Sequence, residues 1–356
     1  MRVLHVISSL EIGGAQRLLS DLLPMQRQQG IDVSLLVLKP EDNEFSQKIV
    51  TTGVPIISLD VKHLGNPFSV VRIRRIIKDY DIVHAHLVHA LYLCSVAARG
   101  MNTSLVYTEH STYNNRRRYV LLRPIEKWIY GRYQKLACVS QQAQEALQKW
   151  QQKDTERFSV VNNGIDTTYF TSIRREVIPN SLIMVSRFVP SKDQETVIRA
   201  MQLLDKEITL RLVGDGETLE HCKQVAKDCQ VEDRVFYLGA RADVAELMAA
   251  SYIGIQSSKW EGFGLTAVEM MAVGLPVIAT DVDGLKQVVG EAGLLFPVGD
   301  YTILSEMIKA IICDKAKYDS MVKASKEKAA DFDISHCVWK YSEIYKEVRQ
   351  KNPQDK

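Results

Sequence analysis

Residues 253–279 read IGIQSSKWEGFGLTAVEMMAVGLPVIA, and this segment does most to decide the fold. Its two ends, Ile253–Ile255 and Val277–Ala279, are short apolar runs of the kind that form buried strands. Between them lie a glycine turn and an apolar, helix-favouring run. Because parallel strands need a crossover that is usually helical, the segment predicts a β–α–β unit.

The same alternation of strand-like and helix-like runs extends along the rest of the chain. Further runs rich in Val, Ile and Leu occur at Val3–Ile7, Val33–Leu38, Ile56–Leu59, Ile82–Ala85, Leu105–Thr108, Leu136–Val139, Ser159–Val161, Leu182–Val185, Leu210–Val213, Val235–Leu238 and Leu294–Phe296. Apolar strands separated by helices are typical of parallel sheets that are covered on both faces. The pattern predicts an α/β protein built from two Rossmann-like, doubly wound domains.

A polar stretch at 171–180 lacks periodicity and ends in a turn signal, Pro-Asn. It predicts an N-terminal domain at 1–172 and a C-terminal domain at 180–334. The last segment, about 335–351, has the apolar spacing of a helix, at Trp339, Tyr341, Ile344, Tyr345 and Val348.

Composition excludes several classes of protein. The chain has 356 residues, 46% hydrophobic and 25% charged, with a net charge of +2 that gives no indication of nucleic-acid binding. No apolar run approaches the roughly 20 residues that span a bilayer. The sequence opens in a strand pattern without a signal-peptide core, and its six cysteines lack metal-site or redox spacing. We therefore expect a cytoplasmic protein with reduced thiols.

Two carboxylates flank the Gly-Phe-Gly turn of the opening segment. Gly264 lets backbone approach a ligand, and the helix that follows would point free N–H groups at a diphosphate. Glu261 would sit beside the phosphates, and Glu269, roughly one turn inside the helix, would reach hydroxyls. This arrangement favours a nucleotide sugar over a bare phosphate. In the alternative interpretation, Thr266 and Glu269 form a capping box and only stabilise the helix start.

Two other strand ends carry groups suited to phosphate. Gly13-Gly14 follows the first strand at the start of a helix, where adjacent glycines permit close approach to an anion. Arg187 follows the strand at Leu182–Val185, and Lys192 lies five residues further on. Ligands of doubly wound proteins bind at this carboxyl edge of the sheet. A solvated surface charge is the simpler interpretation of either cation alone.

Taken together, these motifs resemble those of the retaining GT-B glycosyltransferases of family 4. The resemblance runs through most of the chain and is carried by Gly13-Gly14, Asp81-Ile-Val-His-Ala-His86, Thr108-Glu-His110, Asn163-Gly164-Ile-Asp166, Ser186-Arg187, Lys192-Asp-Gln194, Leu212-Val-Gly-Asp-Gly216, Leu238-Gly239 and the segment from Glu261 to Thr280. It implies a C-terminal domain that binds the sugar nucleotide and an N-terminal domain that binds the acceptor. The two domains would face a cleft, and the final helix would cross back onto the N-terminal domain.

The resemblance also implies a role for individual residues. Arg187 and Lys192 match the diphosphate-binding cations, and His110 matches an active-site histidine near the donor sugar. Glu261 matches the glutamate that reaches hydroxyls of the donor sugar, and Glu269 the one that holds the ribose. The remaining donor contacts fall on Gly14, on the base-packing segment Gly239, Ala240 and Arg241, and on the helix start at Gly264, Leu265 and Thr266. Gln287 departs from the family pattern, which often has a glutamate there.

These residues predict a retaining, metal-independent glycosyltransferase that uses a UDP- or GDP-sugar and no cofactor. The acceptor would be a glycan, a lipid-linked sugar or another hydroxyl compound of surface polysaccharide or glycolipid synthesis. Asp281-Val-Asp283 is interpreted as a surface loop rather than a metal site. Two other classes stay open: a non-catalytic sugar-nucleotide-binding protein and a GT-B-like sugar-nucleotide epimerase.

The stretch 113–135 is basic and rich in aromatic residues, with seven cations against Glu126. We expect most of its apolar positions to form the buried face of a helix, namely Leu121, Leu122, Ile125, Trp128 and Ile129. Arg116, Arg117 and Arg118 are left for function, on the acceptor side with Gly13 and His86. Such a stretch suits an anionic membrane surface or a phosphate-bearing acceptor, and a membrane surface would place the protein peripherally at the inner face of the plasma membrane.

Overall fold

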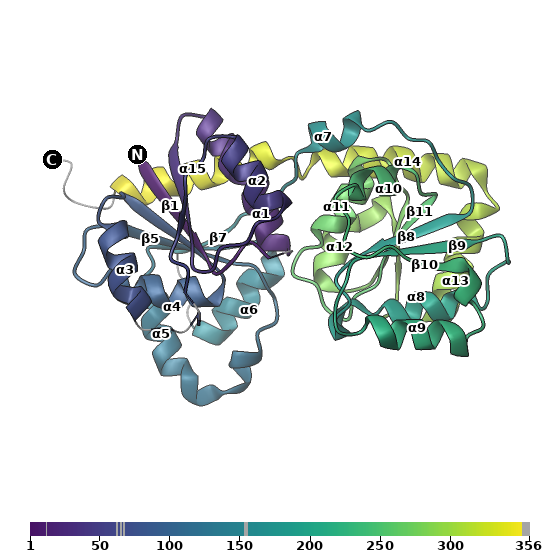
Figure 1. The fold of residues 1–356 in the computed structure, drawn as a ribbon, viewed down its shortest axis with the longest axis horizontal. Helices are drawn as coiled ribbons and strands as arrows, with labels where there is room; N and C mark the ends of the chain where they lie inside the picture. Colours follow the sequence, from purple (N-terminus) through teal and green to yellow (C-terminus); the bar gives the residue numbers. More distant parts are fainter. Residues whose placement is uncertain (12, 62, 65, 67, 153–155, 351–356) are drawn as a thin grey trace. The chain divides into compact units, whose positions relative to one another are not determined.

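The computed structural model describes residues 1–350 except 12, 62, 65, 67 and 153–155. It divides into two compact units (Figure 1). The first comprises Met1–Gly164 and the C-terminal segment that begins at Ile334, and the second comprises Ile165–Asp333. The chain enters the second unit before the expected boundary at 171–180, because helix α7 (Thr167–Ser172) packs against a helix of that unit.

The first unit contains a seven-stranded parallel sheet of order β3-β2-β1-β4-β5-β6-β7. Its strands are β1 (Arg2–Ile7), β2 (Asp32–Val37), β3 (Ile56–Ser58), β4 (Ile82–His86), β5 (Ser104–Glu109), β6 (Lys135–Cys138) and β7 (Phe158–Val160). Its helices are α1 (Gly14–Gln28), α2 (Glu44–Thr51), α3 (Phe68–Ile77), α4 (Leu87–Ala97), α5 (Arg123–Gly131), α6 (Gln141–Gln151) and α15 (Ile334–Gln350).

The second unit contains a six-stranded parallel sheet of order β10-β9-β8-β11-β12-β13. Its strands are β8 (Ser181–Val185), β9 (Thr209–Val213), β10 (Val235–Tyr237), β11 (Ile253–Gln256), β12 (Val277–Thr280) and β13 (Leu294–Phe296). Besides α7, its helices are α8 (Gln194–Met201), α9 (Leu219–Asp228), α10 (Val244–Ala249), α11 (Leu265–Ala272), α12 (Asp283–Val289), α13 (Tyr301–Ile312) and α14 (Lys315–Ala330).

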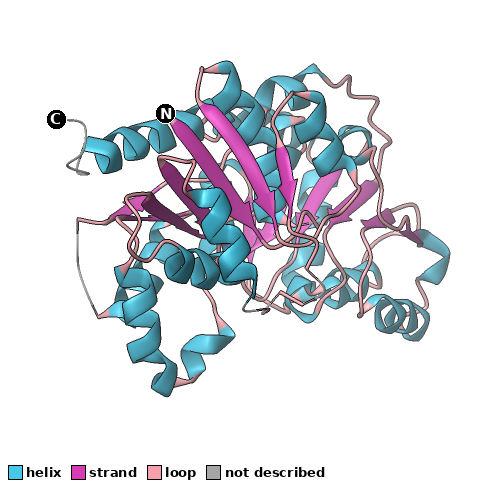
Figure 2. Ribbon diagram, turned by 60° about the vertical axis from the view of Figure 1, so that its left-hand side comes forward, coloured by secondary structure: helices cyan, strands magenta, loops and turns pink. Residues whose placement is uncertain are grey.

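Both sheets confirm the predicted doubly wound α/β fold. Helices cover both faces of the strands (Figure 2), and every predicted strand overlaps an observed one. In each sheet the strand order reverses next to the first strand of the unit, at β1/β4 and at β8/β11. Ligands of such folds bind outside the carboxyl ends of the strands at these switch points. This rule directs the search for a site to the loops after β1, β4, β8 and β11.

Helix α15 completes the core of the first unit. Val338, Tyr341, Tyr345 and Val348 are buried, whereas Trp339, expected among the apolar positions, is 60% exposed. No helix of the described residues is long and apolar enough to cross a bilayer.

Candidate active site

The turn after β8 presents the first of the two expected diphosphate-binding cations. The Arg187 side chain is exposed and has no hydrogen-bond or ion-pair partner among the described residues. Its backbone, in contrast, is held by buried Gln194, whose Nε2 donates to Ser186 Oγ at 3.0 Å and to the Arg187 carbonyl at 2.9 Å. The guanidinium is thus available to an anion while the turn that carries it is fixed.

Two glycines bring the loop after β9 against this turn. Gly214 and Gly216 have φ values of 134° and 148°. A Cβ added to Gly214 would lie 2.1 Å from the Ser186 carbonyl oxygen, and one added to Gly216 would lie 2.3 Å from that of Phe188. The Phe188 amide donates to the Asp215 carbonyl at 2.8 Å across the contact. Only glycine allows so close an approach, so the two loops position each other.

Lys192 and Glu261, expected to contact phosphate and sugar respectively, form an ion pair. Lys192 ends the short helix η3 (Pro190–Lys192), and Glu261 lies in the loop after β11. The two side chains are 19% and 18% exposed, and the loops are joined by the Lys259 amide, which donates to the Ser191 carbonyl at 2.8 Å. An incoming phosphate would therefore compete with Glu261 for the ammonium group of Lys192.

Helix α11 begins at the Gly-Phe-Gly turn and tests the capping-box interpretation of Glu269. Gly264 is the N-cap, with φ 97°, and no side chain caps the helix. Thr266 lies inside the helix as its second residue, so the capping-box interpretation is wrong. Because the first amides of an α-helix lack intrahelical acceptors, Leu265 and Thr266 supply N–H donors at this end. The half-buried Glu269 lies one turn further along.

The loop after β12, where the sequence departs from the family pattern, leads into a helix that packs against the Gly-Phe-Gly turn. Gly284, in the first turn of α12, packs directly on it. A Cβ at Gly284 would lie 2.6 Å from the Glu261 carbonyl oxygen and 2.8 Å from the Phe263 amide nitrogen. Gly284 therefore fixes the backbone that carries Glu261, a contribution that the sequence analysis missed.

Other residues singled out from the sequence lie at the surface of the second unit. Gly239, Ala240 and Arg241 follow β10, and Arg241 Nε and Nη2 donate to the two carboxylate oxygens of Asp243 at 2.7 and 2.5 Å. Asp281 and Asp283 are both exposed, and Asp281 pairs with Lys286 at 3.0 Å.

In the first unit, the loop after β1 leads into an uncapped helix. Gly13 is the N-cap of α1, with an extended backbone and no capping side chain, and the first turn of α1 contains no acidic residue. The first amides of α1, from Gly14 onward, thus lie at the β1/β4 switch point. This geometry suits an anion.

Four histidines gather on the neighbouring strands β1, β4 and β5. His5 and His84 are register partners on β1 and β4, His86 ends β4, and His110 directly follows β5. Burial lowers the pKa of His5 to about 3 and that of His110 to about 4, and it lowers the pKa of His84 and His86 well below the usual range. All four imidazoles are therefore neutral at pH 7.

His5 is far from the other three histidines in the sequence and joins them only through the pairing of β1 with β4. The available signal was the strand order, because a doubly wound sheet places the first strand beside the fourth. His5, His84 and His86 also offer ring nitrogens within 4.8 Å of one another, which is close enough for a metal. Each of these nitrogens, however, already has a hydrogen-bond partner in the protein. A metal would have to displace those bonds.

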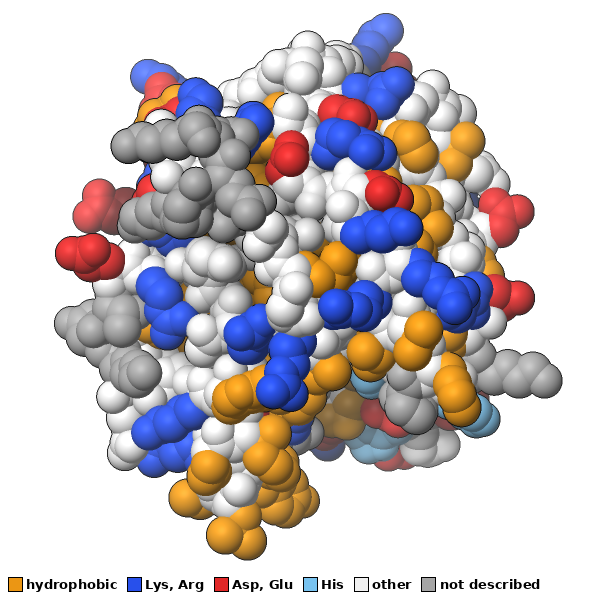
Figure 3. All heavy atoms as spheres, turned by 90° about the vertical axis from the view of Figure 1, so that its left-hand side faces the viewer, with side chains coloured by type: hydrophobic (Ala, Val, Ile, Leu, Met, Phe, Trp, Pro, Cys, Tyr) orange, Lys and Arg blue, Asp and Glu red, His pale blue; other side chains and the backbone are white. Residues whose placement is uncertain are grey.

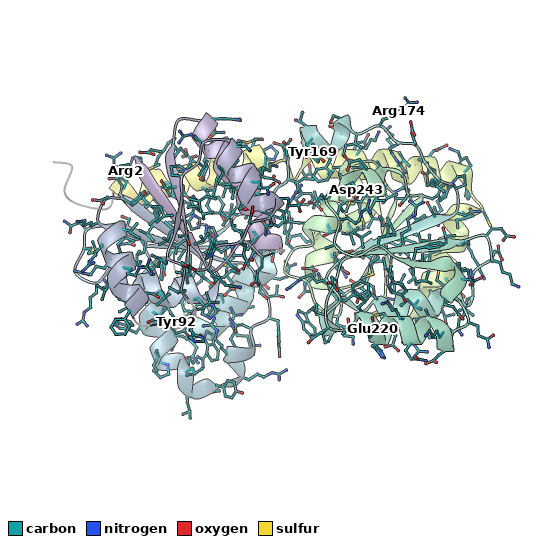
Figure 4. The ribbon with its side chains drawn as sticks, in the orientation of Figure 1. Arg2, Tyr92, Tyr169, Arg174, Glu220 and Asp243 are labelled. Carbon is teal, nitrogen blue, oxygen red and sulfur yellow. The ribbon has the colours of Figure 1, made fainter. Side chains whose placement is uncertain are left out.

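The expectation that Arg116 and Arg117 are left for function is contradicted by their contacts. Arg116 Nη1 donates to buried Glu126 at 2.6 Å and to the Tyr92 hydroxyl at 2.8 Å. Tyr92 projects from α4 in the lower part of the first unit (Figure 4). Arg117 Nη2 donates to buried Glu109 at 2.9 Å. Both arginines therefore neutralise buried carboxylates, as a charge inside a protein requires.

The apolar residues of the same stretch are not the buried face that the sequence suggested. Only Ile129 is buried, at 3% exposed, whereas Leu121 is 92% exposed. They form, with their neighbours, a patch that we call the apolar tip: Tyr119, Val120, Leu121, Leu122, Ile125 and Trp128. Tyr119, the short helix η2 (Val120–Leu122) and helix α5 carry it. Figure 3 shows apolar side chains projecting at the lower edge of this unit.

Comparison with known proteins accounts for both units. The model of glycosyltransferase family 4 matches residues 12–169, and that of glycosyl transferases group 1 matches residues 167–328. The chain is 34% identical over 172 residues to N-acetyl-alpha-D-glucosaminyl L-malate synthase of Bacillus anthracis, a match that spans 47% of this chain and 45% of that protein.

Two further similarities extend over nearly the whole chain. The UDP-Gal:alpha-D-GlcNAc-diphosphoundecaprenol alpha-1,3-galactosyltransferase of Escherichia coli is 23% identical, over 97% of this chain and 96% of that one. The structure of Anabaena Alr3699/HepE in complex with UDP-glucose has a TM-score of 0.87 at 23% identity, covering 98% of this chain and 100% of the other. With two doubly wound units, each matched by its own family model, the chain belongs to the GT-B glycosyltransferases of the family 4 and group 1 type.

Proposed function

We propose that the protein is a retaining, metal-independent glycosyltransferase that transfers a sugar from a UDP-sugar or GDP-sugar to a hydroxyl acceptor. The observation that carries this proposal is the grouping of Arg187, the Lys192–Glu261 pair and the open helix start at Gly264 in the second unit. Cations and free amides suit a diphosphate, and a carboxylate beside them suits sugar hydroxyls. UDP is favoured as the nucleotide, since the similar Escherichia coli enzyme is a UDP-Gal galactosyltransferase and the similar Anabaena protein was solved in complex with UDP-glucose.

Glycosyl transfer requires the leaving nucleoside diphosphate to gain negative charge while the anomeric carbon becomes cationic. Arg187, Lys192 and the amides of Leu265 and Thr266 would stabilise that charge as fixed donors. On binding, the diphosphate would take Lys192 from Glu261, whose carboxylate would then accept hydrogen bonds from the donor sugar. Retention would follow if the acceptor attacks from the face that the phosphate leaves, with a phosphate oxygen as base.

We also propose that the acceptor is held at an anionic membrane, which the apolar tip contacts. The names of two similar proteins include a lipid acceptor: the galactosyltransferase described above and a phosphatidyl-myo-inositol mannosyltransferase of Mycobacterium leprae. Exposed Arg118 and partly exposed Lys127 flank the tip, and Glu126, the single acid of the stretch 113–135, is buried. An apolar tip with a cationic surround matches the interface of anionic lipids.

The proposed function is tested by offering the protein UDP- and GDP-sugars with and without a lipid extract, in EDTA and with added Mg²⁺. A glycosyltransferase would consume the donor and label the lipid, with equal turnover in EDTA. An epimerase would consume the donor without the extract, and a binding protein would show only a ligand-induced rise in Tm. Loss of turnover in EDTA that Mg²⁺ restores would overturn metal independence.

A further inference from the structure

A continuous line of side-chain hydrogen bonds runs from α1 to His110. Gln26 Oε1 lies 3.0 Å from His5 Nε2, and His5 Nδ1 lies 3.0 Å from His86 Nε2. His86 Nδ1 then lies 3.1 Å from His110 Nε2. The line ends at His110 Nδ1, a buried atom with no hydrogen-bond partner among the described residues. Four side chains, from α1, β1, β4 and the turn after β5, thus form a line that ends at one unpaired nitrogen.

The proton on each ring in this line depends on the ring before it. A neutral imidazole has one N–H donor and one bare nitrogen that accepts. His5 and His86 are completely buried, and burial keeps them neutral. If one ring donates through Nε2, the next ring must also donate through Nε2, because each contact needs one donor and one acceptor. The group at the first end of the line, next to His5, therefore determines which nitrogen carries the proton on every ring.

Gln26 sets that end. Its carbonyl oxygen faces His5 Nε2, so His5 must carry its proton there. The Tyr345 hydroxyl lies 2.6 Å from His84 Nδ1, to which it can donate, and 3.3 Å from His5 Nε2, from which it can accept. All contacts around His5 are satisfied by this one arrangement.

We propose that Gln26, His5 and His86 are positioning residues that hold His110 as the Nε2–H tautomer and present its Nδ1 as a bare hydrogen-bond acceptor. The proposed tautomer rests only on the hydrogen-bond geometry of this line. Its use rests on the proposed function: Nδ1 accepts a hydrogen bond from a hydroxyl of the sugar substrate. A buried acceptor that is left unpaired is costly, so a substrate without that hydroxyl binds more weakly.

The tautomer is measured directly by ¹H–¹⁵N NMR of the full-length protein with ¹⁵N-labelled histidine, because long-range correlations distinguish the two protonated nitrogens. In the wild type we expect His110 to be neutral and protonated at Nε2. Gln26→Met removes the nearer of the two acceptors at His5 Nε2 and leaves only the 3.3 Å contact with the Tyr345 hydroxyl, whereas His86→Phe breaks the line. Either change should give a mixture of His110 tautomers. His86→Gln, which can both accept and donate, should restore the Nε2–H form.

His89→Gln is the matched control, since His89 is the neighbouring histidine and contacts Ser8 Oγ at 3.4 Å rather than the line. It should leave the His110 signals unchanged. With the proposed donor, Gln26→Met should lower kcat/KM by about tenfold, the effect of one hydrogen bond. A wild-type His110 protonated at Nδ1, or an unchanged tautomer in Gln26→Met, would overturn the relay. Failure of the donor assay alone would instead count against the proposed function, because the NMR result does not depend on turnover.

Discussion

The apolar tip gives the sharpest test of membrane contact, through the substitution Leu121→Ser. Leu121 is 92% exposed, so almost none of its side chain is used in folding, and the substitution should leave the Tm unchanged. Burying a leucine side chain is worth about 1.5–3 kcal/mol. If the tip enters the lipid interface, Leu121→Ser should therefore weaken vesicle binding by about 2 kcal/mol, or roughly thirtyfold.

The assay is co-sedimentation with vesicles of anionic and of neutral phospholipid, over a series of salt concentrations. The loss caused by Leu121→Ser should be the same at low and high salt, because apolar burial is not screened. The loss caused by Lys127→Gln should shrink as salt rises, since electrostatic attraction to the surface falls off over about 10 Å at 0.1 M. Leu203→Ser, the same change at a leucine of the second unit that is 42% exposed, is the control and should bind as the wild type does. Equal binding by Leu121→Ser and wild type would refute insertion of the tip.

Three further predictions concern ligand binding and folding. Arg187→Ala and Lys192→Ala should each weaken donor binding by roughly tenfold to a hundredfold, measured by calorimetry, as expected for charged hydrogen bonds of about 1.5–3 kcal/mol; wild-type affinity in either variant would contradict the diphosphate site. Glu269→Gln should weaken donor binding, because a neutral amide accepts hydrogen bonds from ribose hydroxyls less strongly than a carboxylate does; unchanged donor affinity would contradict a place for Glu269 in the donor site. Buried His5 and His110 have pKa values of about 3 and 4 in the folded state, below the usual 6.5, so the unfolded chain binds more protons below pH 6.5. Stability should therefore be complete above pH 6.5 and fall towards pH 4 by up to about 1.4 kcal/mol per pH unit for each histidine, and urea unfolding midpoints that do not change with pH would contradict this.

The fold could be predicted from the sequence because each strand is a local pattern. A parallel strand that is buried on both faces must be apolar throughout, so its residues identify it without reference to the rest of the chain. The turn at Gly264 could be predicted in the same way, because the positive φ of this residue is a local conformation that favours glycine.

Contacts between distant segments could not be predicted in the same way. Arg117 pairs with buried Glu109, which is the last residue of β5. The sequence shows β5 only as an apolar run, so it gives no sign that a carboxylate at its end needs a cation. The apolar spacing at 121–129 suggested a buried face, yet spacing does not say whether another element covers that face. The contact between His5 and the other histidines likewise depends on the pairing of β1 with β4, which are distant in the sequence.

The two cations of the second unit should not contribute equally. Arg187 has no ion-pair partner among the described residues, so replacing it removes one contact to the diphosphate and leaves no charge behind. Lys192 also neutralises Glu261, and replacing it leaves a carboxylate, 18% exposed, beside the incoming phosphates. Because like charges repel strongly where water is partly excluded, Lys192→Ala should cost more than Arg187→Ala. Adding Glu261→Gln to Lys192→Ala removes that repulsion and should recover part of the donor affinity, whereas the same addition to Arg187→Ala should recover none. An equal response of the two backgrounds would mean that Glu261 and Lys192 do not share the donor site.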